Sequence, residues 1–325
     1  MSDKTTSTKI NIDTNIKKNS LTKVLYLGPK FSFANLSALK YFGKQFEKDV
    51  EFIPVTTFKD LFEGVSKAKD NEGENTENFQ EQVLAVVPIE NSLAGSVIPN
   101  FDFLCKYDVK IIGEVCLPIQ HNLYAQKGTK ITDIRTVYSH PKALEQCQNF
   151  IQKHMFLSFE TNSTAQAIKD VSQNKNLTKN GEISCVGAIG SAEAGEYYSL
   201  KLLAQNVQDI ADNWTRFLVI KSKDNMSNYL EINTEDKQGK KINKATLIFG
   251  LPHISGSLAS ALTILAKYNN QILKIESRPI PQKPFEYVFY IDVYFDDLTK
   301  FKQSLIESEQ LVINFRNMGV YTQAQ

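Results

Sequence analysis

Two hydrophobic patterns alternate along residues 23–220 of the chain. Short runs of β-branched and other apolar residues predict buried strands, and apolar residues at every third or fourth position predict helices with one buried face. The predicted strands cover residues 23–27, 51–55, 83–89, 109–115, 122–125, 136–138, 185–189 and 217–220. The predicted helices lie around residues 33–42, 58–65, 100–107, 141–151, 164–171 and 192–198. This alternation is typical of an α/β fold, and we expect its sheets to be parallel.

A second pattern follows the polar and charged stretch 223–241, which predicts a linker with a short strand at 229–232. Beyond it, strands are predicted at 244–251, 272–276, 287–294 and 312–315, and helices at 255–267 and 299–307. The order βαββαβ is that of the ferredoxin-like fold. We therefore divide the chain into a disordered polar extension (1–22), a first domain (23–222), the linker (223–241) and a second domain (242–322).

The composition narrows the classes of partner. The 325 residues carry a formal net charge of +1, so no overall field attracts nucleic acid or an anionic membrane. No apolar run is long enough to span a bilayer, and the polar residues 1–20 lack the apolar core of a signal peptide. We expect a cytoplasmic protein. Residues 67–82 are acidic and rich in Asn, which predicts a surface insertion.

Metal and cofactor chemistry has no recognisable pattern in this sequence. The four cysteines form no C-x-x-C pair, and the four histidines lack the spacing of metal ligands. The apolar surroundings of the cysteines predict that their thiols are unpaired and buried. The turn Gly28-Pro29-Lys30 holds too little glycine for a nucleotide-binding loop. We expect neither a metal nor a cofactor.

Three polar clusters stand at the ends of predicted strands. They are Glu90-Asn91-Ser92, Ser139-His140, and the group Asn213, Thr215 and Arg216. Because sites in open α/β sheets form at strand ends, we expect the clusters to converge on one crevice. Hydroxyls, amides, one carboxylate and one guanidinium suit a small anion rich in oxygen atoms. Ser163-Thr164 begins a predicted helix, where an N-cap is the simpler interpretation.

Five stretches of the first domain resemble, in the right order, the motifs of one family, the prephenate dehydratases. They are Tyr26-Leu27-Gly28-Pro29-Lys30, Val87-Pro88-Ile89-Glu90-Asn91-Ser92, Val137-Tyr138-Ser139-His140-Pro141, Ser163-Thr164-Ala165 and Thr215-Arg216-Phe217. The second domain resembles an ACT regulatory domain, in which Gly256-Ser257-Leu258 and Glu276-Ser277-Arg278-Pro279 are similar to the effector-binding signatures. The resemblance covers roughly residues 23–320.

The resemblance implies a fold and a reaction. The fold is two α/β lobes around a cleft, similar to periplasmic binding proteins, with the catalytic strand returning to the first lobe. The reaction is the loss of CO₂ and hydroxide from prephenate, which gives phenylpyruvate for phenylalanine synthesis. Because aromatisation drives this step, no cofactor is required. The enzyme helps hydroxide to leave and orients the carboxylates of the substrate.

The match with the family's motifs implies the site residues. Thr215 matches the essential threonine and is assigned as the donor to the leaving hydroxyl. The other catalytic assignments are Asn91, Ser139, Gln146 and Glu90, and the substrate-binding assignments are Ser92, Gly95, His140, Ser163, Thr164, Arg216 and Phe217. A structural role is an equal alternative for Glu90, because a carboxylate beside a dianionic substrate is unfavourable. The fork geometry of Arg216 suits a clamp on a substrate carboxylate, but strand alternation points its side chain away from Thr215. An ion pair that stabilises the lobe is the alternative role for Arg216.

The resemblance also implies regulation and assembly. L-Phenylalanine is the expected effector, bound by Gly256, Ser257, Leu258, Glu276, Ser277, Arg278 and Pro279. ACT units usually pair across subunits, so we expect a homodimer or a homotetramer. Two residues depart from the family pattern: Phe31 stands in place of glycine and Ser257 in place of alanine. An arogenate dehydratase and a catalytically silent amino-acid-binding protein are alternatives to a monofunctional prephenate dehydratase.

Overall fold

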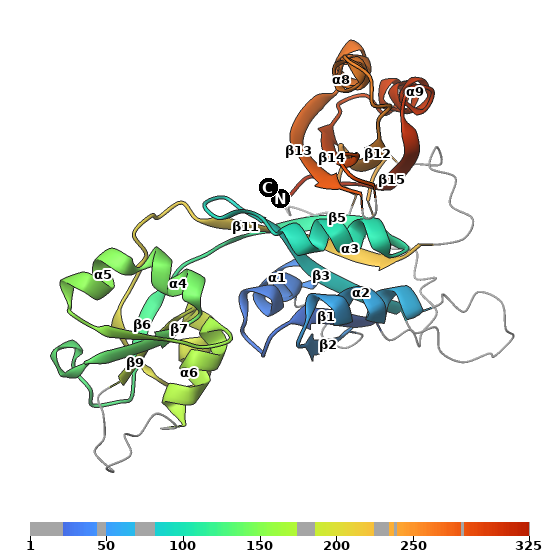
Figure 1. The fold of residues 1–325 in the computed structure, drawn as a ribbon. Helices are drawn as coiled ribbons and strands as arrows, with labels where there is room; N and C mark the ends of the chain where they lie inside the picture. The colour runs from blue at the N-terminus through green and yellow to red at the C-terminus, as the bar shows by residue number, and fades with distance from the viewer. Residues whose placement is uncertain are drawn as a thin grey trace, which may run out of the picture.

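The computed structural model describes residues 22–43, 50–68, 82–173, 186–223, 234–236, 239–280 and 283–324. This part of the chain forms three bodies (Figure 1). Two α/β lobes lie side by side, and a smaller unit of strands and helices packs on the first lobe. The predicted extension up to residue 21, most of the insertion (69–81) and the strand at 229–232 lie outside the described residues.

The first lobe is built on a sheet with the strand order β2-β1-β3-β11-β5. Its strands are β1 (Thr22–Leu27), β2 (Val50–Val55), β3 (Gln82–Asn91), β5 (Val109–Pro118) and β11 (Trp214–Ser222), with the short β4 (Gly95–Ser96) beside β3. β1 is parallel to β2 and β3, whereas β11 is antiparallel to both β3 and β5. The expectation of parallel sheets is therefore wrong, because the chain returns from the second lobe and enters this sheet in the opposite direction.

Helices α1 (Phe33–Phe42), α2 (Phe58–Lys67) and α3 (Ile98–Lys106) cover the two faces of this sheet. The alternation of side chains along β11 decides which face each residue joins. Leu218 and Ile220 pack in one core with α2 and α3, whereas Phe217 and Val219 pack in the other core with α1. Consequently Thr215 belongs to the α1 side of the sheet and Arg216 to the opposite side.

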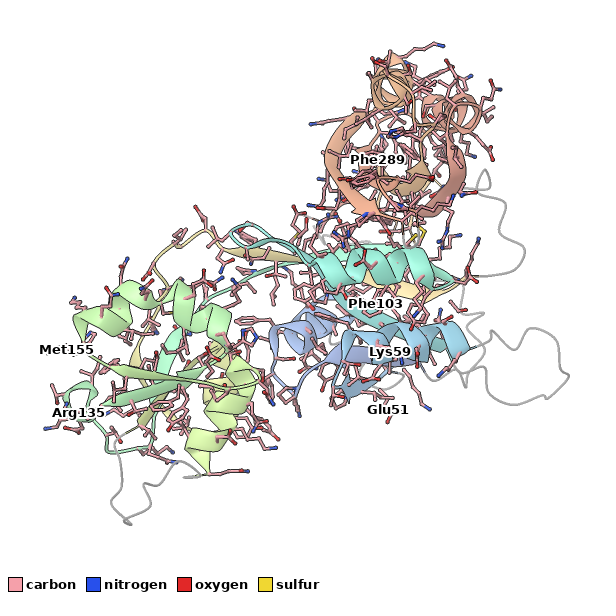
Figure 2. All side chains as sticks on the ribbon, viewed as in Figure 1. Glu51, Lys59, Phe103, Arg135, Met155 and Phe289 are labelled. Atoms are coloured by element: carbon pink, nitrogen blue, oxygen red, sulfur yellow. The ribbon has the colours of Figure 1, made fainter. Side chains whose placement is uncertain are left out.

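The second lobe has the strand order β10-β6-β9-β7-β8. It comprises β6 (Asn122–Ala125), β7 (Thr136–Ser139), β8 (Leu157–Glu160), β9 (Val186–Gly190), β10 (Lys201–Ala204), α4 (Pro141–Gln146), α5 (Gln148–Lys153), α6 (Thr164–Ser172), α7 (Ala192–Tyr197) and a 3-10 turn, Ile131–Asp133. The hydrophobic pattern does not predict β8 and β10, because they are edge strands whose residues are partly or fully exposed. This sheet is also mixed, since β6 is antiparallel to β9 and β10. Arg135 and Met155 lie at the end of the lobe farthest from the first lobe (Figure 2).

The chain crosses between the lobes twice, from β5 to β6 and from β10 to β11. The two crossing segments are hydrogen-bonded to each other. The amide of Ile119 donates to the carbonyl oxygen of Asn213 (2.7 Å), and the amide of Val207 donates to that of His121 (2.8 Å). The junction between the lobes is therefore a short backbone ladder rather than two independent linkers.

The C-terminal unit confirms the predicted βαββαβ order. It contains β12 (Lys244–Gly250), α8 (Ser257–Lys267), β13 (Gln271–Pro279), β14 (Tyr287–Tyr294), α9 (Leu298–Glu309) and β15 (Ile313–Tyr321), and its antiparallel sheet has the order β13-β14-β12-β15. The last strand is longer than the predicted 312–315. Its second half lies against the first lobe, where Met318 and Tyr321 are buried in the core beside α2 and α3.

The structure bears on two predictions from composition. Of the helices there, none is both long and apolar enough to cross a bilayer. Cys105, Cys116 and Cys147 are free thiols, as predicted, but only Cys147 is buried. Cys105 is exposed because it lies near the end of α3 on its outer side. Cys185 lies outside the described residues.

Gly319 of β15 marks a close approach between the C-terminal unit and the first lobe. A Cβ atom at this position would overlap the backbone carbonyl of Ile111 in β5. A side chain here would therefore push two backbones apart, which is a common reason for glycine inside a strand.

We predict that Gly319→Ala lowers the free energy of unfolding by about 1–3 kcal/mol, as overpacking usually does. Gly250→Ala is the matched control, because the Cβ of that variant would meet its nearest neighbours at 3.5 Å or more. Denaturant unfolding of both variants measures the difference. Equal stabilities would contradict the close approach.

Candidate active site

Thr215 and Asn91 meet where β11 begins and β3 ends. The two residues are partners in the antiparallel register of these strands. The amide nitrogen of Asn91, Nδ2, lies 3.0 Å from Thr215 Oγ1 and 3.1 Å from the carbonyl oxygen of Trp214. The sheet register therefore brings together the two motifs that carry the predicted catalytic threonine and asparagine.

The other contacts of Asn91 determine which way its amide faces. Its Oδ1 accepts hydrogen bonds from the backbone amides of Leu93 (3.1 Å) and Ala94 (2.8 Å), so Nδ2 must be the atom that faces Thr215. Nδ2 has two hydrogens for three neighbouring oxygens, those of Thr215, Trp214 and Asn213, so one hydrogen is shared between two acceptors. Because Nδ2 can only donate, Thr215 Oγ1 is an acceptor in this contact. The hydroxyl hydrogen of Thr215 is then directed elsewhere and can donate to a substrate atom.

A line of hydrogen bonds continues from Asn91 into the second lobe. Asn91 Nδ2 donates to Asn213 Oδ1 (2.6 Å), and Asn213 Nδ2 donates to Gln146 Oε1 (3.1 Å). Gln146 Oε1 also lies 3.0 Å from Nε2 of His121. Asn213 and His121 are only 1% and 2% exposed, and hydrogen bonds are electrostatically stronger in such surroundings. The predicted catalytic residues Thr215, Asn91 and Gln146 thus belong to one connected group.

Asn213 and His121 are absent from the predicted site residues. Asn213 stands two positions before Thr215 in the third polar cluster, and that proximity is the signal that could have included it. No sequence signal singles out His121, because only the crossing of the chain between the lobes brings it to Gln146.

The opposite side of β11 carries a buried cluster of charges. Arg216, with a side chain 12% exposed, forms ion pairs with Glu90 (3.1 Å), Glu114 (3.2 Å) and Asp292 (2.7 Å). Asp292 belongs to β14 of the C-terminal unit. Burial disfavours the charged guanidinium, but the carboxylates, chiefly Asp292, outweigh it and raise the pKa of Arg216 above its ordinary value.

Two lysines of the C-terminal unit complete this charge cluster. Lys244 Nζ donates to both carboxylate oxygens of Glu114 (3.0 and 2.8 Å), and Lys274 Nζ donates to Glu90 Oε1 (2.8 Å). Burial favours the neutral form of Glu90, but the hydrogen bond from Lys274 and the charge of Arg216 outweigh it and hold the pKa of Glu90 below its ordinary value. Glu90 and Arg216 therefore face the C-terminal unit. These contacts fit the structural alternative for each residue, with the ion pairs joining the C-terminal unit to the first lobe.

Three further predicted residues lie in the first lobe. Ser92 Oγ accepts from the amide of Trp214 (2.9 Å) and donates to the carbonyl oxygen of Asp212 (3.4 Å), so it supports the start of β11. Gly95 has a φ of 78°, which the turn between β3 and β4 requires. Phe217 is 2% exposed and packs with α1, so its contacts are those of a core residue and not of a substrate ligand.

The second lobe places its predicted residues at a strand end and at helix starts. Ser139 is fully buried and donates to the carbonyl oxygen of Ile189 (2.6 Å). Ser163 caps α6 by accepting from the amide of Gln166 (3.1 Å), in line with the simpler interpretation of this motif. Thr164 is buried in the first turn of the same helix.

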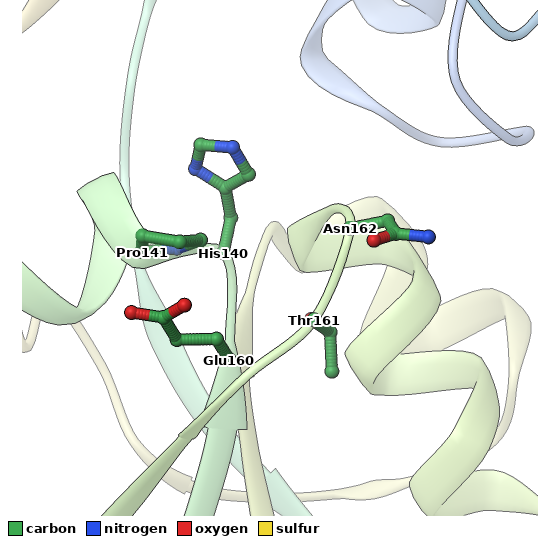
Figure 3. Close-up of a pocket in the computed structure, with 5 residues that line it drawn as sticks. All are labelled: His140, Pro141, Glu160, Thr161 and Asn162. Carbon is green, nitrogen blue, oxygen red and sulfur yellow. The ribbon is translucent and has the colours of Figure 1, made fainter.

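An open pocket of about 440 Å³ lies at the start of α4 (Figure 3). It is lined by His140, Pro141, Glu160, Thr161 and Asn162. Burial lowers the pKa of His140, and its Nδ1 accepts a hydrogen bond from the amide of Lys142 (3.2 Å). The ring of His140 points toward the first lobe, which is drawn in blue in Figure 3. Across all described residues, no group of three His, Cys, Asp or Glu side chains is placed to hold a metal ion.

Phe31 connects the two lobes. Its backbone has a φ of 66°, in the left-handed region that favours glycine. Its ring meets that of Tyr197 in α7 with centroids 4.5 Å apart, and Lys30 Nζ lies 5.2 Å and 4.9 Å from the two centroids. Phe31, where the resemblance leads us to expect glycine, therefore keeps a glycine-like backbone and adds an aromatic contact between the lobes.

The first group of predicted effector residues surrounds the start of α8. Gly256 has a φ of 86° and precedes the helix. Ser257 Oγ lies 2.7 Å from the carbonyl oxygens of both Pro252 and Ile254, and its single hydrogen is donated to one of them or shared, which closes the loop before the helix. Leu258 follows in the first turn and is half-buried. The hydroxyl of Ser257, where the resemblance leads us to expect alanine, is thus used within the loop.

The second group lies on β13 and contacts the first lobe. Glu276 accepts a hydrogen bond from Ser96 (2.6 Å), and Arg278 holds the carboxylate of Asp102 through two bonds (2.8 and 3.1 Å). The neighbouring residues on the other side of the strand, Ser277 and Pro279, are exposed. Two of the predicted effector residues therefore connect the C-terminal unit with the first lobe in this structure.

Comparison with known proteins shows consistent similarities. The family model described as prephenate dehydratase matches residues 24–225. A prephenate dehydratase from Methanocaldococcus jannaschii is 35% identical over 297 residues, which are 91% of this chain and 96% of that protein. The prephenate dehydratase structure from Staphylococcus aureus gives a TM-score of 0.71 at 28% identity and covers 92% of this chain and 100% of that one. The structure from Arthrobacter aurescens, a prephenate dehydratase in complex with L-Phe, gives a TM-score of 0.72 at 24% identity, with 93% and 90% covered.

Fold and site together define a two-lobed α/β enzyme, followed by a ferredoxin-like unit. More particularly, the chain belongs to the prephenate dehydratase family. The matched residues 24–225 include both lobes and both crossings, and therefore the whole line of hydrogen bonds from Thr215 to His121.

We predict that Arg216→Met lowers the free energy of unfolding by about 3–5 kcal/mol, the usual cost of removing one partner from a buried ion pair. Adding Asp292→Asn should recover part of this loss, because Glu114 and Glu90 keep Lys244 and Lys274 as partners. Denaturant unfolding of the single and double variants measures the coupling. Simply additive losses would show that the charges do not act as one cluster.

Proposed function

We propose that this protein converts prephenate to phenylpyruvate, CO₂ and water, with Thr215 as the hydrogen-bond donor to the leaving hydroxyl. The observation that supports this role is the direction of the hydrogen bond between Asn91 and Thr215. Asn91 Nδ2 donates to Thr215 Oγ1 from 3.0 Å, so the hydroxyl hydrogen remains available to the substrate. Membership of the family supports the choice of substrate.

The reaction breaks two bonds of the substrate and forms an aromatic ring. The bond between the ring and its carboxylate breaks, and its electron pair enters the ring as CO₂ leaves. As this electron pair enters the ring, the ring C–O bond breaks with its own pair on oxygen, and the departing hydroxide takes up a proton from the solvent to become water. A fixed donor such as Thr215 stabilises the negative charge that develops on this oxygen.

We propose that hydrogen-bond donors from both lobes make the remaining contacts with the substrate. Gln146 Oε1 is engaged by Asn213 and His121, so the Nε2 hydrogens of Gln146 are the part of its amide that can face a substrate. The substrate is a dianion, which suits donors of this kind. The substrate-binding roles of Ser92, Gly95, His140, Ser163 and Thr164, and the catalytic role of Ser139, stay predictions.

We predict that Thr215→Ala lowers kcat for prephenate about 100- to 1000-fold, the usual effect of removing one preorganised donor. Thr215→Ser is the matched control, because it keeps the hydroxyl, and it should retain most of the activity. The absorbance of the phenylpyruvate enolate in alkali measures turnover, and parallel assays with arogenate compare the two substrates. Full activity of Thr215→Ala would contradict the role assigned to this hydroxyl.

We further propose that L-phenylalanine binds the C-terminal unit and inhibits the enzyme. Gly256 exposes backbone at the start of α8, where no described atom lies within 4 Å of a Cβ position, so a small ligand can approach closely. The relative from Arthrobacter aurescens was solved in complex with L-Phe. Because Glu276 and Arg278 bind Ser96 and Asp102, a ligand at β13 would act on contacts with the catalytic lobe.

A homodimer or homotetramer is proposed on the basis of the edge strand β13. Leu273 and Ile275 are exposed on this strand, and an exposed apolar edge favours pairing with a second copy of the chain. Light scattering of the purified protein measures the mass of the assembly. A monomer mass at all concentrations would contradict the proposal. A cytoplasmic location stays a prediction.

We predict that L-phenylalanine inhibits the wild-type protein and that Gly256→Val removes most of this inhibition. The branched side chain would occupy the approach to the backbone and would be strained at a φ of 86°. Inhibition curves measure the shift, and activity without phenylalanine should stay near that of wild type. Unchanged inhibition of Gly256→Val would exclude this loop as the binding site.

A further inference from the structure

His121 is a buried histidine held at the junction of the two lobes. Its backbone amide donates to Gln208 Oε1 (2.9 Å), and its carbonyl oxygen accepts from the amide of Val207 (2.8 Å), both in the second crossing. Its ring meets Phe33 of the first lobe edge-on at 5.7 Å and Gln146 of the second lobe at 3.0 Å. The ring is therefore fixed from its own backbone and from both lobes.

The hydrogen-bond line assigns the tautomer of this ring. Asn213 Oδ1 accepts from Asn91, so Asn213 Nδ2 donates, and Gln146 must present Oε1 to it. An oxygen at that position can only accept, so His121 Nε2 must carry a hydrogen. Nδ1 of His121 is buried and has no hydrogen-bond partner within the described part of the chain. Burial, the largest influence, lowers the pKa of His121 and favours the neutral ring.

We infer that His121 is a positioning residue for the reaction, and this inference rests on the proposed function. Through its Nε2 hydrogen it holds the oxygen end of the Gln146 amide toward Asn213. With Gln146 reversed and the hydrogen of His121 kept on Nε2, the NH₂ group of Gln146 would face donors of both His121 and Asn213, and the line would lose two hydrogen bonds. The bond from His121 thus helps to fix the direction of each hydrogen bond from Gln146 to Asn91. At the end of this line, Thr215 accepts from Asn91 and keeps its own hydrogen for the substrate.

The first test compares variants of equal side-chain length. His121→Met removes the donor, and we expect kcat to fall about 10- to 100-fold, since a displacement of about 1 Å in a catalytic group has effects of this size. His121→Gln keeps an amide hydrogen near the position of Nε2 and should recover most of the activity. His154→Met is the matched control, because His154 lies in the second lobe and stacks on Phe156 outside the hydrogen-bond line. Full activity of His121→Met would overturn the inference.

A double-mutant cycle separates positioning from a general effect on folding. If His121 acts through the Thr215 hydroxyl, His121→Met should cause little further loss in a protein that already carries Thr215→Ala. The same fractional loss in both backgrounds would overturn the inference, because it would show an effect independent of Thr215. Absence of prephenate turnover in the wild type and in His154→Met would instead contradict the proposed function.

A readout without turnover tests the tautomer even where His121→Met does not fold. Long-range ¹H–¹⁵N NMR of the wild-type protein distinguishes a protonated Nε2 from a protonated Nδ1, and the folded His121→Gln variant identifies the signals of this ring. We expect a neutral ring with hydrogen on Nε2 only. A hydrogen on Nδ1 alone would overturn the inference, because Nε2 would then be unable to donate to Gln146.

Discussion

Strand β11 presents two adjacent residues to opposite sides of one sheet, and the rest of the structure depends on this alternation. Thr215 pairs with Asn91 on the side that faces the second lobe, and Arg216 pairs with Glu90 on the side that faces the C-terminal unit. The side-chain period of a strand is two, so a slip of one residue in the register would exchange the two roles. The buried ion pairs of Arg216 work against such a slip, because they would have to be broken. The charge cluster therefore stabilises the register on which the proposed catalytic site depends, without contacting Thr215.

The proposed catalytic group is assembled from both lobes. Asn91 belongs to the first lobe, Gln146 to the second, and Asn213 and His121 to the two crossings between them. Each bond in this line has a defined direction, because the backbone amides of Leu93 and Ala94 fix the Asn91 end. A movement of one lobe against the other would disturb this line. The same strand is linked through Arg216 to Asp292 of β14, so a change in the C-terminal unit has a physical route to Thr215. This connection can regulate the enzyme only if the C-terminal unit adopts two states that bind the effector differently.

Residue type and spacing were sufficient to predict those features that depend on local sequence. The strand that ends at Asn91 and the strand that begins near Thr215 follow from short apolar runs, and the family motifs then connect the two. The direction of β11 was predicted wrongly, because it is decided by where the chain returns after the second lobe. The ion pair between Arg216 and Asp292 could not be predicted from local sequence, because Asp292 lies in the C-terminal unit. His121 has no local signal and gains its place only from the crossing of the chain.

The central claim is that Asn91 turns the hydroxyl hydrogen of Thr215 outward. Neutron diffraction from crystals exchanged into deuterium oxide measures this directly, because it locates deuterium on both side chains. The account predicts deuterium on Asn91 Nδ2 directed at Thr215 Oγ1, and the hydroxyl deuterium of Thr215 directed away from Asn91. A hydroxyl deuterium directed at Asn91, with its amide reversed, would contradict the account.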